Sequence, residues 1–133
     1  MNKAADSAAH AFAAAISRQD VNAIAELTTE HHRFIDSLGN VVEGRDKMRA
    51  GWAGYFRMVP DYTITIDETY GSGAVVVMLG SAQGTYAPDG KLAEDHRWRT
   101  AAVFRAVIDN GKVAEWRVYA DNEPIRKLMT AHG

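Results

Sequence analysis

The sequence predicts an α+β domain in which amino-terminal helices pack on a strongly curved, mostly antiparallel sheet around one pocket. Apolar residues recur about every 3.6 positions before Pro60 and at every second position after it. Helices followed by a run of strands are typical of α+β folds. A length of 133 residues suits one domain, so we expect residues 1–133 to form a single unit.

The helices are expected in the first 28 residues and again before Pro60. Residues 4–16 are rich in alanine, the strongest helix former, with Phe12 and Ile16 one turn apart. Asp20 is a good N-cap for a short helix over residues 21–27. A third helix is predicted over residues 45–58, because large apolar side chains recur there at helical spacing and Pro60 ends the pattern.

The remaining elements are predicted from alternation and from turn residues. Gly39-Asn40 indicates a turn in a short hairpin, and Asp109-Asn110-Gly111-Lys112 is a strong hairpin signal. The apolar run from Val75 to Leu79 suggests a strand that is buried on both faces. The predicted strands, followed by a short helix over residues 125–129, are residues 33–42 (the hairpin), 62–67, 74–86, 97–108 and 113–120.

Composition excludes several classes of function. With no cysteine, the chain has no disulfide, thiolate metal site or cysteine nucleophile, and we expect a cytoplasmic protein. No apolar stretch approaches the ~20 residues of a membrane span. A net charge of -2 gives no electrostatic footprint for nucleic acid. Arg97, Arg99 and Arg105 cluster on one alternating segment, where a solvated strand face or ion pairs are expected.

Several short motifs occur in an order that resembles the nuclear-transport-factor-2-like superfamily and its SnoaL-like members. They are Asp20-Val21-Asn22-Ala23-Ile24, Phe34-Ile35-Asp36-Ser37-Leu38-Gly39, Glu43-Gly44-Arg45, Pro60-Asp61-Tyr62, Gly84-Thr85-Tyr86 and Gly111-Lys112-Val113-Ala114-Glu115-Trp116. The resemblance covers nearly the whole chain and implies a cone-shaped, cystatin-like roll. The superfamily includes isomerases, cyclases, hydrolases, dehydratases and non-catalytic binders, so the fold does not define the activity.

Asp36 is the first candidate for catalysis. It lies in an apolar stretch between Ile35 and Leu38, where an unpaired charge would be costly. In the ketosteroid isomerases, a carboxylate in this context is the general base, and desolvation makes a carboxylate a better base. The competing interpretation is that Asp36 accepts hydrogen bonds from the backbone amides of a turn, as Asp residues commonly do.

The catalytic residues of two reactions known in the superfamily are absent from this sequence. Alignment with the steroid isomerases places Phe12 and Val103 where that family has its two oxyanion donors, and neither side chain can donate a hydrogen bond. Alignment with the limonene epoxide hydrolases places Val118 at a catalytic aspartate. Both reactions are therefore disfavoured.

The SnoaL-like polyketide cyclases are the closer comparison, and they imply a pocket His and Asp from the last two strands. His96 on the penultimate strand and Asp121 at the end of the last strand are the matching residue types. Alternation places Asp121 on the face opposite Trp116, so a pocket role for Asp121 requires a bulge if Trp116 faces the pocket. The alternatives are a helix cap or ion pair for Asp121 and a half-exposed strand position for His96.

A metal site is not expected, since His31 and His32 are adjacent and no third ligand accompanies them at ligand spacing. His32 is instead a candidate for orienting Asp36. Most large aromatic side chains are expected in the core, with Trp52 and Tyr55 as candidates for the pocket mouth. The candidate substrate contacts are His32, Trp52, Tyr55, Phe12, Val103 and Trp116.

The sequence leaves two hypotheses open. The first is a cofactor-independent enzyme of isomerase or cyclase type that moves a proton on a hydrophobic carbonyl compound, with Asp36 as the base and His32, Tyr55 or His96 positioning the substrate. The second is a non-catalytic ligand-binding or dimerisation module of the same fold. The resemblance also implies a homodimer formed through the outer face of the sheet.

Overall fold

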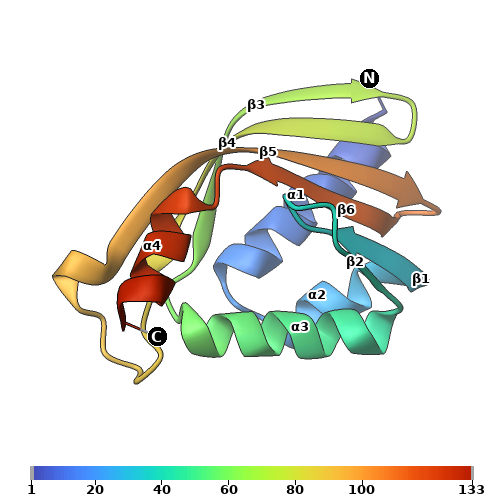
Figure 1. The fold of residues 1–133 in the computed structure, drawn as a ribbon. Helices are drawn as coiled ribbons and strands as arrows, with labels where there is room; N and C mark the ends of the chain where they lie inside the picture. The colour runs from blue at the N-terminus through green and yellow to red at the C-terminus, as the bar shows by residue number, and fades with distance from the viewer. Residues whose placement is uncertain (1, 133) are drawn as a thin grey trace.

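The computed structural model describes residues 2–132 and confirms the α+β class. Four α-helices and one short 3-10 turn accompany a single six-stranded sheet (Figure 1). The elements are, in chain order, α1 Lys3–Ser17, α2 Val21–Glu26, β1 Thr28–Ile35, β2 Val41–Glu43, α3 Arg45–Met58, β3 Thr63–Ser72, β4 Val75–Thr85, η1 Glu94–His96, β5 Arg97–Asp109, β6 Lys112–Ala120 and α4 Glu123–His132.

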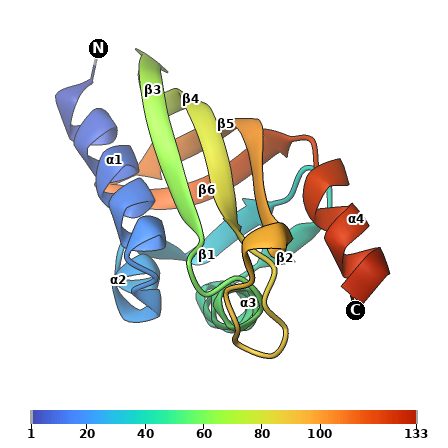
Figure 2. The same cartoon turned by 90° about the vertical axis from the view of Figure 1, so that its left-hand side faces the viewer.

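The sheet is mixed rather than purely antiparallel, with strand order β2-β1-β6-β5-β4-β3. Strand β1 pairs with β6 in parallel, and all other neighbours are antiparallel. The edge strands β2 and β3 do not pair with each other, so the sheet curves without closing into a barrel. Figure 2 looks along α3 and shows α1 and α4 on opposite sides of the curved strands, with α3 end-on below them.

Local signals in the sequence position the helices. The Asn2 side chain caps α1 by accepting from the Ala5 amide, and Asp20 caps α2 by accepting from the Ala23 amide, as predicted. The predicted third helix matches α3 from Arg45 to Met58. Helix α4 is longer than the predicted residues 125–129. Among residues 2–132, no helix has the length and apolar character needed to cross a membrane.

The core lies on the concave face of the sheet, against α1. Trp116 of β6 is fully buried between the rings of Phe12 and Phe104, at centroid distances of 4.8 and 5.5 Å. Helix α1 crosses β3 to β6 and supplies Phe12 and Ile16, both 0% exposed. Burial of aromatic side chains on this scale contributes a large share of the stability of a small domain.

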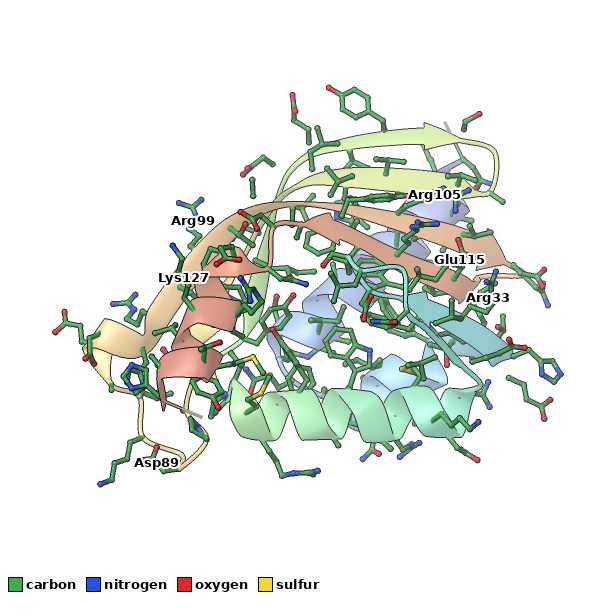
Figure 3. The ribbon with its side chains drawn as sticks, in the orientation of Figure 1. Arg33, Asp89, Arg99, Arg105, Glu115 and Lys127 are labelled. Carbon is green, nitrogen blue, oxygen red and sulfur yellow. The ribbon has the colours of Figure 1, made fainter. Side chains whose placement is uncertain are left out.

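The outer face of the sheet is partly apolar and partly charged. Glu115 of β6 accepts from Arg33 at 3.1 Å and from Arg105 at 2.7 Å, an ion-pair network that joins β1, β6 and β5 (Figure 3). Strand β4 is buried mainly on its concave side, because Val76 and Met78 are buried while Val75 and Val77 are half-buried. Farther along the strand, the neighbours Ser81 and Ala82 are both buried, so the expected burial on both faces holds for that part of β4 and is only partial at Val75 and Val77.

Two boundaries differ from the prediction in ways that matter for the site. Strand β1 begins at Thr28, five residues before the predicted Arg33, because its amino-terminal half is held by pairing with β6. His96 is not on the penultimate strand but in η1, the turn that precedes it. Its backbone position is set by the hydrogen bond from the Tyr86 amide to the His96 carbonyl, at 3.0 Å.

Candidate functional site

A cavity of about 520 Å³ lies on the concave side of the sheet, between α3, α4 and the ends of β1 and β6. Its wall is mostly apolar, with a few polar side chains near α4 and the β1–β2 turn. The lining residues are Phe34, Asp36, Ser37, Leu38, Val42, Met48, Gly51, Trp52, Tyr55, Met58, Tyr62, Val118, Asn122, Ile125, Arg126 and Met129. A concave apolar site of this size with few polar groups is typical of small-molecule pockets.

Aromatic rings form one continuous side of this cavity. Trp52 of α3 lies edge-on to Phe34, with ring centroids 5.5 Å apart, and edge-on to Tyr55 at 6.3 Å. Tyr55 in turn lies edge-on to Tyr62 at 5.0 Å. Because each ring is held by its neighbours, the wall is preformed and needs little ordering when a ligand binds.

The two tyrosines supply neutral hydrogen-bond donors in this apolar wall. Burial raises the pKa of Tyr55 and of Tyr62 well above the ordinary value, and for Tyr62 a charge on Tyr55 would raise the pKa further. Both phenols therefore stay protonated at any physiological pH. Within residues 2–132, neither hydroxyl makes a hydrogen bond to another protein group, and both residues line the cavity.

Asp36 lies in the cavity wall, at the turn between β1 and β2. Its Oδ1 accepts from the backbone amides of Leu38 and Asn40, both at 2.9 Å, and its Oδ2 accepts from the Asn40 side chain at 3.1 Å. The carboxylate thus builds the turn, and the residue lies in the lining of the cavity. These hydrogen bonds confirm the turn interpretation of Asp36, whereas its role as a base stays a prediction.

Helix α4 closes the cavity opposite α3. Ile125 and Met129, one turn apart, contribute apolar surface, and Arg126 contributes the aliphatic part of its side chain. The Arg126 guanidinium pairs with Glu123 at 2.7 Å on the exposed side. The Asn122 side chain donates to the Ser37 hydroxyl and so ties the start of α4 to the β1–β2 turn.

The structure does not bring His96 and Asp121 to this cavity. The Nδ1 atom of His96 lies 3.1 Å from the Tyr86 carbonyl oxygen, and its ring packs on His132 at 4.1 Å between centroids. Asp121 is exposed, and its Oδ1 accepts from the Glu123 amide at 2.9 Å at the start of α4. Neither residue belongs to the lining, so the three candidate catalytic groups are not assembled in one place.

The six candidate substrate contacts separate into two groups. Trp52 and Tyr55 line the cavity. Phe12, Trp116 and His32 are fully buried in the core behind it, where Phe12 packs on both of the others. Val103 is half-buried on the outer face, because its neighbours Ala102 and Phe104 point to the concave side.

His32 is a buried histidine that does not reach Asp36. Its Nδ1–H donates to the Val113 carbonyl at 2.7 Å, which leaves Nε2 unprotonated and, within the described chain, without a partner. Burial lowers the pKa of His32, and the Val113 hydrogen bond and the Glu115 charge oppose that shift only in part. The imidazole is therefore neutral in the folded protein near pH 7.

This burial predicts a pH-dependent stability. Below about pH 6.5, His32 takes up a proton in the unfolded chain but not in the folded chain, because its folded pKa is lower. The free energy of unfolding therefore decreases as the pH is lowered, by up to about 1.4 kcal/mol per pH unit, until the folded pKa is reached. Above about pH 6.5 this loss is absent. Urea unfolding at pH 7.5 and 5.5 should show a larger loss for the wild type than for His32→Gln. Parallel pH profiles for the two proteins would contradict the assignment.

Several lining residues were not among the sequence candidates. Tyr62 was assigned only to a strand, and Asn122 and Arg126 were not considered. The spacing of Ile125 and Met129 does indicate an amphipathic helical turn, and its apolar side could have been expected to line a cavity. Tyr62 stood in the motif Pro60-Asp61-Tyr62, but this motif did not indicate a place in the cavity, which depends on contacts with Trp52 and Tyr55 of α3.

Comparisons with known proteins agree with this fold. The profile of the SnoaL-like domain family matches residues 9–116. A proposed SnoaL-like polyketide cyclase from Shewanella putrefaciens superposes with a TM-score of 0.82 at 18% identity, over 99% of both chains. An LEH-like epoxide hydrolase from M. tuberculosis gives a TM-score of 0.78 at 16% identity, over 97% of this chain and 91% of that one.

A third solved structure holds a small ligand. A hypothetical protein from Catenulispora acidiphila with a ketosteroid-isomerase-like fold, in complex with trimethylamine, gives a TM-score of 0.73 at 18% identity, over 84% of this chain and 83% of that one. No curated protein matches the chain significantly. At these identities the solved structures establish the fold alone.

Proposed function

This chain belongs to the SnoaL-like domain family, and from that premise we propose that its cavity binds a hydrophobic small molecule that carries a carbonyl group. The family includes cyclases, isomerases and epoxide hydrolases, so membership leaves the ligand and the reaction open. What supports this ligand class is the chemistry of the wall, where neutral phenol donors stand in an otherwise aromatic and aliphatic surface.

The phenols of Tyr55 and Tyr62 carry this proposal. An apolar ligand gains from leaving water, but a buried phenol without a partner loses the hydrogen bond that it makes to water when exposed. A ligand carbonyl oxygen restores that bond. The cavity therefore favours a molecule that combines apolar rings with one or two acceptor oxygens over a hydrocarbon of the same shape.

Two bicyclic probes that differ by one oxygen test this directly. We expect 1-tetralone to bind about 2- to 12-fold more tightly than tetralin, which corresponds to one net hydrogen bond. In the double variant Tyr55→Phe, Tyr62→Phe the preference should disappear while tetralin binding is kept. Calorimetric titration can measure both affinities. Equal affinities in the wild type, or a preference that survives in the double variant, would rule out the tyrosines as the carbonyl site.

Catalysis by Asp36 is the second candidate, favoured by its place in the same cavity wall as the tyrosines. In this scheme the carboxylate takes a proton from the carbon next to the carbonyl, and the phenols donate to the oxygen on which negative charge develops. The donors would be Tyr55 and Tyr62 instead of the positions occupied by Phe12 and Val103. His96 and Asp121 have no part in it.

The non-catalytic alternative is also supported by an observation. All three hydrogen bonds of Asp36 serve the turn, and His96 and Asp121 are likewise tied to backbone groups. A binding module needs only the cavity and its donors. The two schemes share the ligand and differ only in whether a proton leaves it.

Hydrogen exchange on a bound ketone separates the two schemes. The enzyme scheme predicts that the protein accelerates exchange of the α-protons of 2-tetralone in D₂O, and that Asp36→Asn loses about 10²-fold or more of that acceleration. Asparagine keeps an oxygen for the Leu38 and Asn40 amides, so the turn and the ligand affinity should be retained. Proton NMR measures the exchange rate. Equal acceleration by both proteins would rule out Asp36 as the base, and no acceleration by either would leave the binding module as the function.

We also propose that two copies pair through the outer face of the sheet. Tyr119 is 47% exposed there, and Val75, Val77, Val103 and Val107 are half-buried on the same face. An exposed apolar surface of this kind on a sheet is typical of a subunit interface. Sedimentation equilibrium should give twice the mass of the chain, and a monomer at micromolar concentration would contradict the pairing.

A further inference from the structure

We propose that a second, polar groove on the outer face of the sheet binds a phosphate group. This groove has a volume of about 540 Å³ and lies at the end of the sheet where β4 leaves and β5 begins. It is lined by Asp61, Thr63, Thr65, Gln83, Gly84, Arg97, Trp98 and Arg99. Figure 3 shows Arg99 on the outer side of β5, away from α3 and the cavity.

The register of three strands places the polar side chains in rows. Arg99 of β5 is opposite Gln83 of β4, which is opposite Thr63 of β3. In the next row along β5, Arg97 is opposite Thr85. Residues two apart in a strand point to the same face, so both guanidinium groups stand over one polar surface. Adjacent strands are about 4.8 Å apart, which brings all of these groups within reach of one small ligand.

A hydrogen-bond network fixes the direction of the donors in this groove. The Gln83 side-chain nitrogen donates to the hydroxyls of Thr63 and Thr65, at 2.9 and 3.1 Å, and to the Thr63 carbonyl at 3.1 Å. The Ser81 hydroxyl donates to the Gln83 oxygen at 2.9 Å. Since each threonine hydroxyl already accepts from Gln83, its own proton is left to donate outward.

The charges in the groove favour an anion. Within residues 2–132, the ion pairs include neither Arg97 nor Arg99, unlike Arg105 farther along the same strand, which pairs with Glu115. Arg99 makes only a long contact of 3.4 Å to the Ser81 hydroxyl. Asp61 is the acidic side chain in the lining, and its oxygens accept from the amide and hydroxyl of Thr85, each at 2.7 Å. The two arginines outnumber this one carboxylate, so the lining keeps a positive charge.

The number of donors selects phosphate over a carboxylate. Two guanidinium forks and two hydroxyl protons offer more donors than the two oxygens of a carboxylate can accept, whereas a phosphate group presents three terminal oxygens to them. The volume of the groove exceeds that of a phosphate, which leaves room for the organic part of a phosphomonoester. This site is separate from the apolar cavity: Tyr62 in the cavity wall packs on Trp98 in the groove wall, with 6.0 Å between ring centroids.

Titration with inorganic phosphate at constant ionic strength, followed by amide NMR shifts, tests the proposal. Inorganic phosphate has no apolar part and so does not report on the cavity. We expect saturable shifts at Gln83 and Arg99, and an affinity that falls about fivefold or more in Arg99→Gln and in Arg97→Gln. The matched control is Arg57→Gln, which removes an exposed arginine from α3, outside the lining of the groove. This variant should bind phosphate as the wild type does.

A parallel titration with acetate at the same concentrations tests whether the groove distinguishes phosphate from a carboxylate. Weak or absent shifts with acetate, together with the losses in the two groove variants, support a phosphate site. The proposal would be overturned by shifts that do not saturate or by shifts that acetate reproduces. It would also be overturned if phosphate binding were unchanged in both groove variants or weakened equally in Arg57→Gln.

Discussion

Gly80→Ala should destabilise the domain by about 3 kcal/mol or more, because it forces a methyl group into the backbone of the neighbouring strand. A Cβ at position 80 of β4 would lie 1.7 Å from the Thr65 carbonyl oxygen and 2.7 Å from its carbon. Both atoms belong to β3, beside the irregularity in pairing between Ile66 and Glu68. Glycine thus allows the close approach of β3 to β4 where the sheet bends.

Gly54→Ala provides the matched control for this prediction. It is the same substitution in the middle of α3, where the new Cβ meets only the end of the Arg57 side chain at 3.6 Å. Alanine should stabilise this helix by up to about 1 kcal/mol. Urea unfolding measures both variants. A loss below about 1 kcal/mol for Gly80→Ala would show that the strands separate easily, contrary to the close contact described here.

Gly51→Leu should weaken the binding of 1-tetralone while making the protein more stable. Gly51 lines the cavity on α3, and a Cβ there has no atom within 4 Å. A leucine side chain would occupy the space of the ligand, and we expect an affinity loss of about tenfold or more. Leucine is a better helix former than glycine by about 0.5–1 kcal/mol, so the variant should unfold at higher urea concentration.

The control is Gly54→Leu, the same substitution three residues later in α3. Gly54 lies on α3 but does not line the cavity, so Gly54→Leu should keep the affinity of the wild type. Calorimetric titration with 1-tetralone measures all three proteins. Tight binding to Gly51→Leu would mean that the ligand occupies another place on the molecule.

The helices could be predicted because their signals are local. Asp20 caps α2 through its own side chain, and Pro60 ends the pattern that defines α3. The start of β1 could not be predicted in this way. Residues Thr28 to His32 show no apolar alternation, and they form a strand because β6, more than 80 positions away in the chain, pairs beside them. Pairing between distant segments leaves no trace in either segment alone.

The site, like the fold, could be predicted where local patterns define it and not where distant segments meet. Trp52 and Tyr55 were expected near the pocket because aromatic side chains recur on one face of α3, and both line the cavity. His96 was placed on the penultimate strand by the resemblance to the SnoaL-like cyclases, whereas it ends the turn before β5. Asp36 was identified together with both of its interpretations, and the structure shows the turn contacts and the cavity position in one residue.

The division of the sheet into two faces explains how one small domain can hold two sites. The concave face and α3 enclose an apolar cavity with phenol donors, whereas the outer face carries charge at Arg97 and Arg99. Alternation along β5 separates the two faces, since Phe104 lies in the core and its neighbour Arg105 pairs with Glu115 on the outer face. A substitution on one face should therefore leave ligand binding on the other unchanged.

The central claim is that the cavity between α3 and α4 is where a hydrophobic carbonyl compound binds, and methionine methyl NMR tests it most directly. Met48, Met58 and Met129 line the cavity, whereas Met78 is fully buried in the core outside it. On titration with 1-tetralone, the account predicts saturable ring-current shifts of the three cavity methyl groups and an unchanged Met78. Saturated binding with no shift at the three cavity methyls, or with Met78 moving as far as they do, would contradict it.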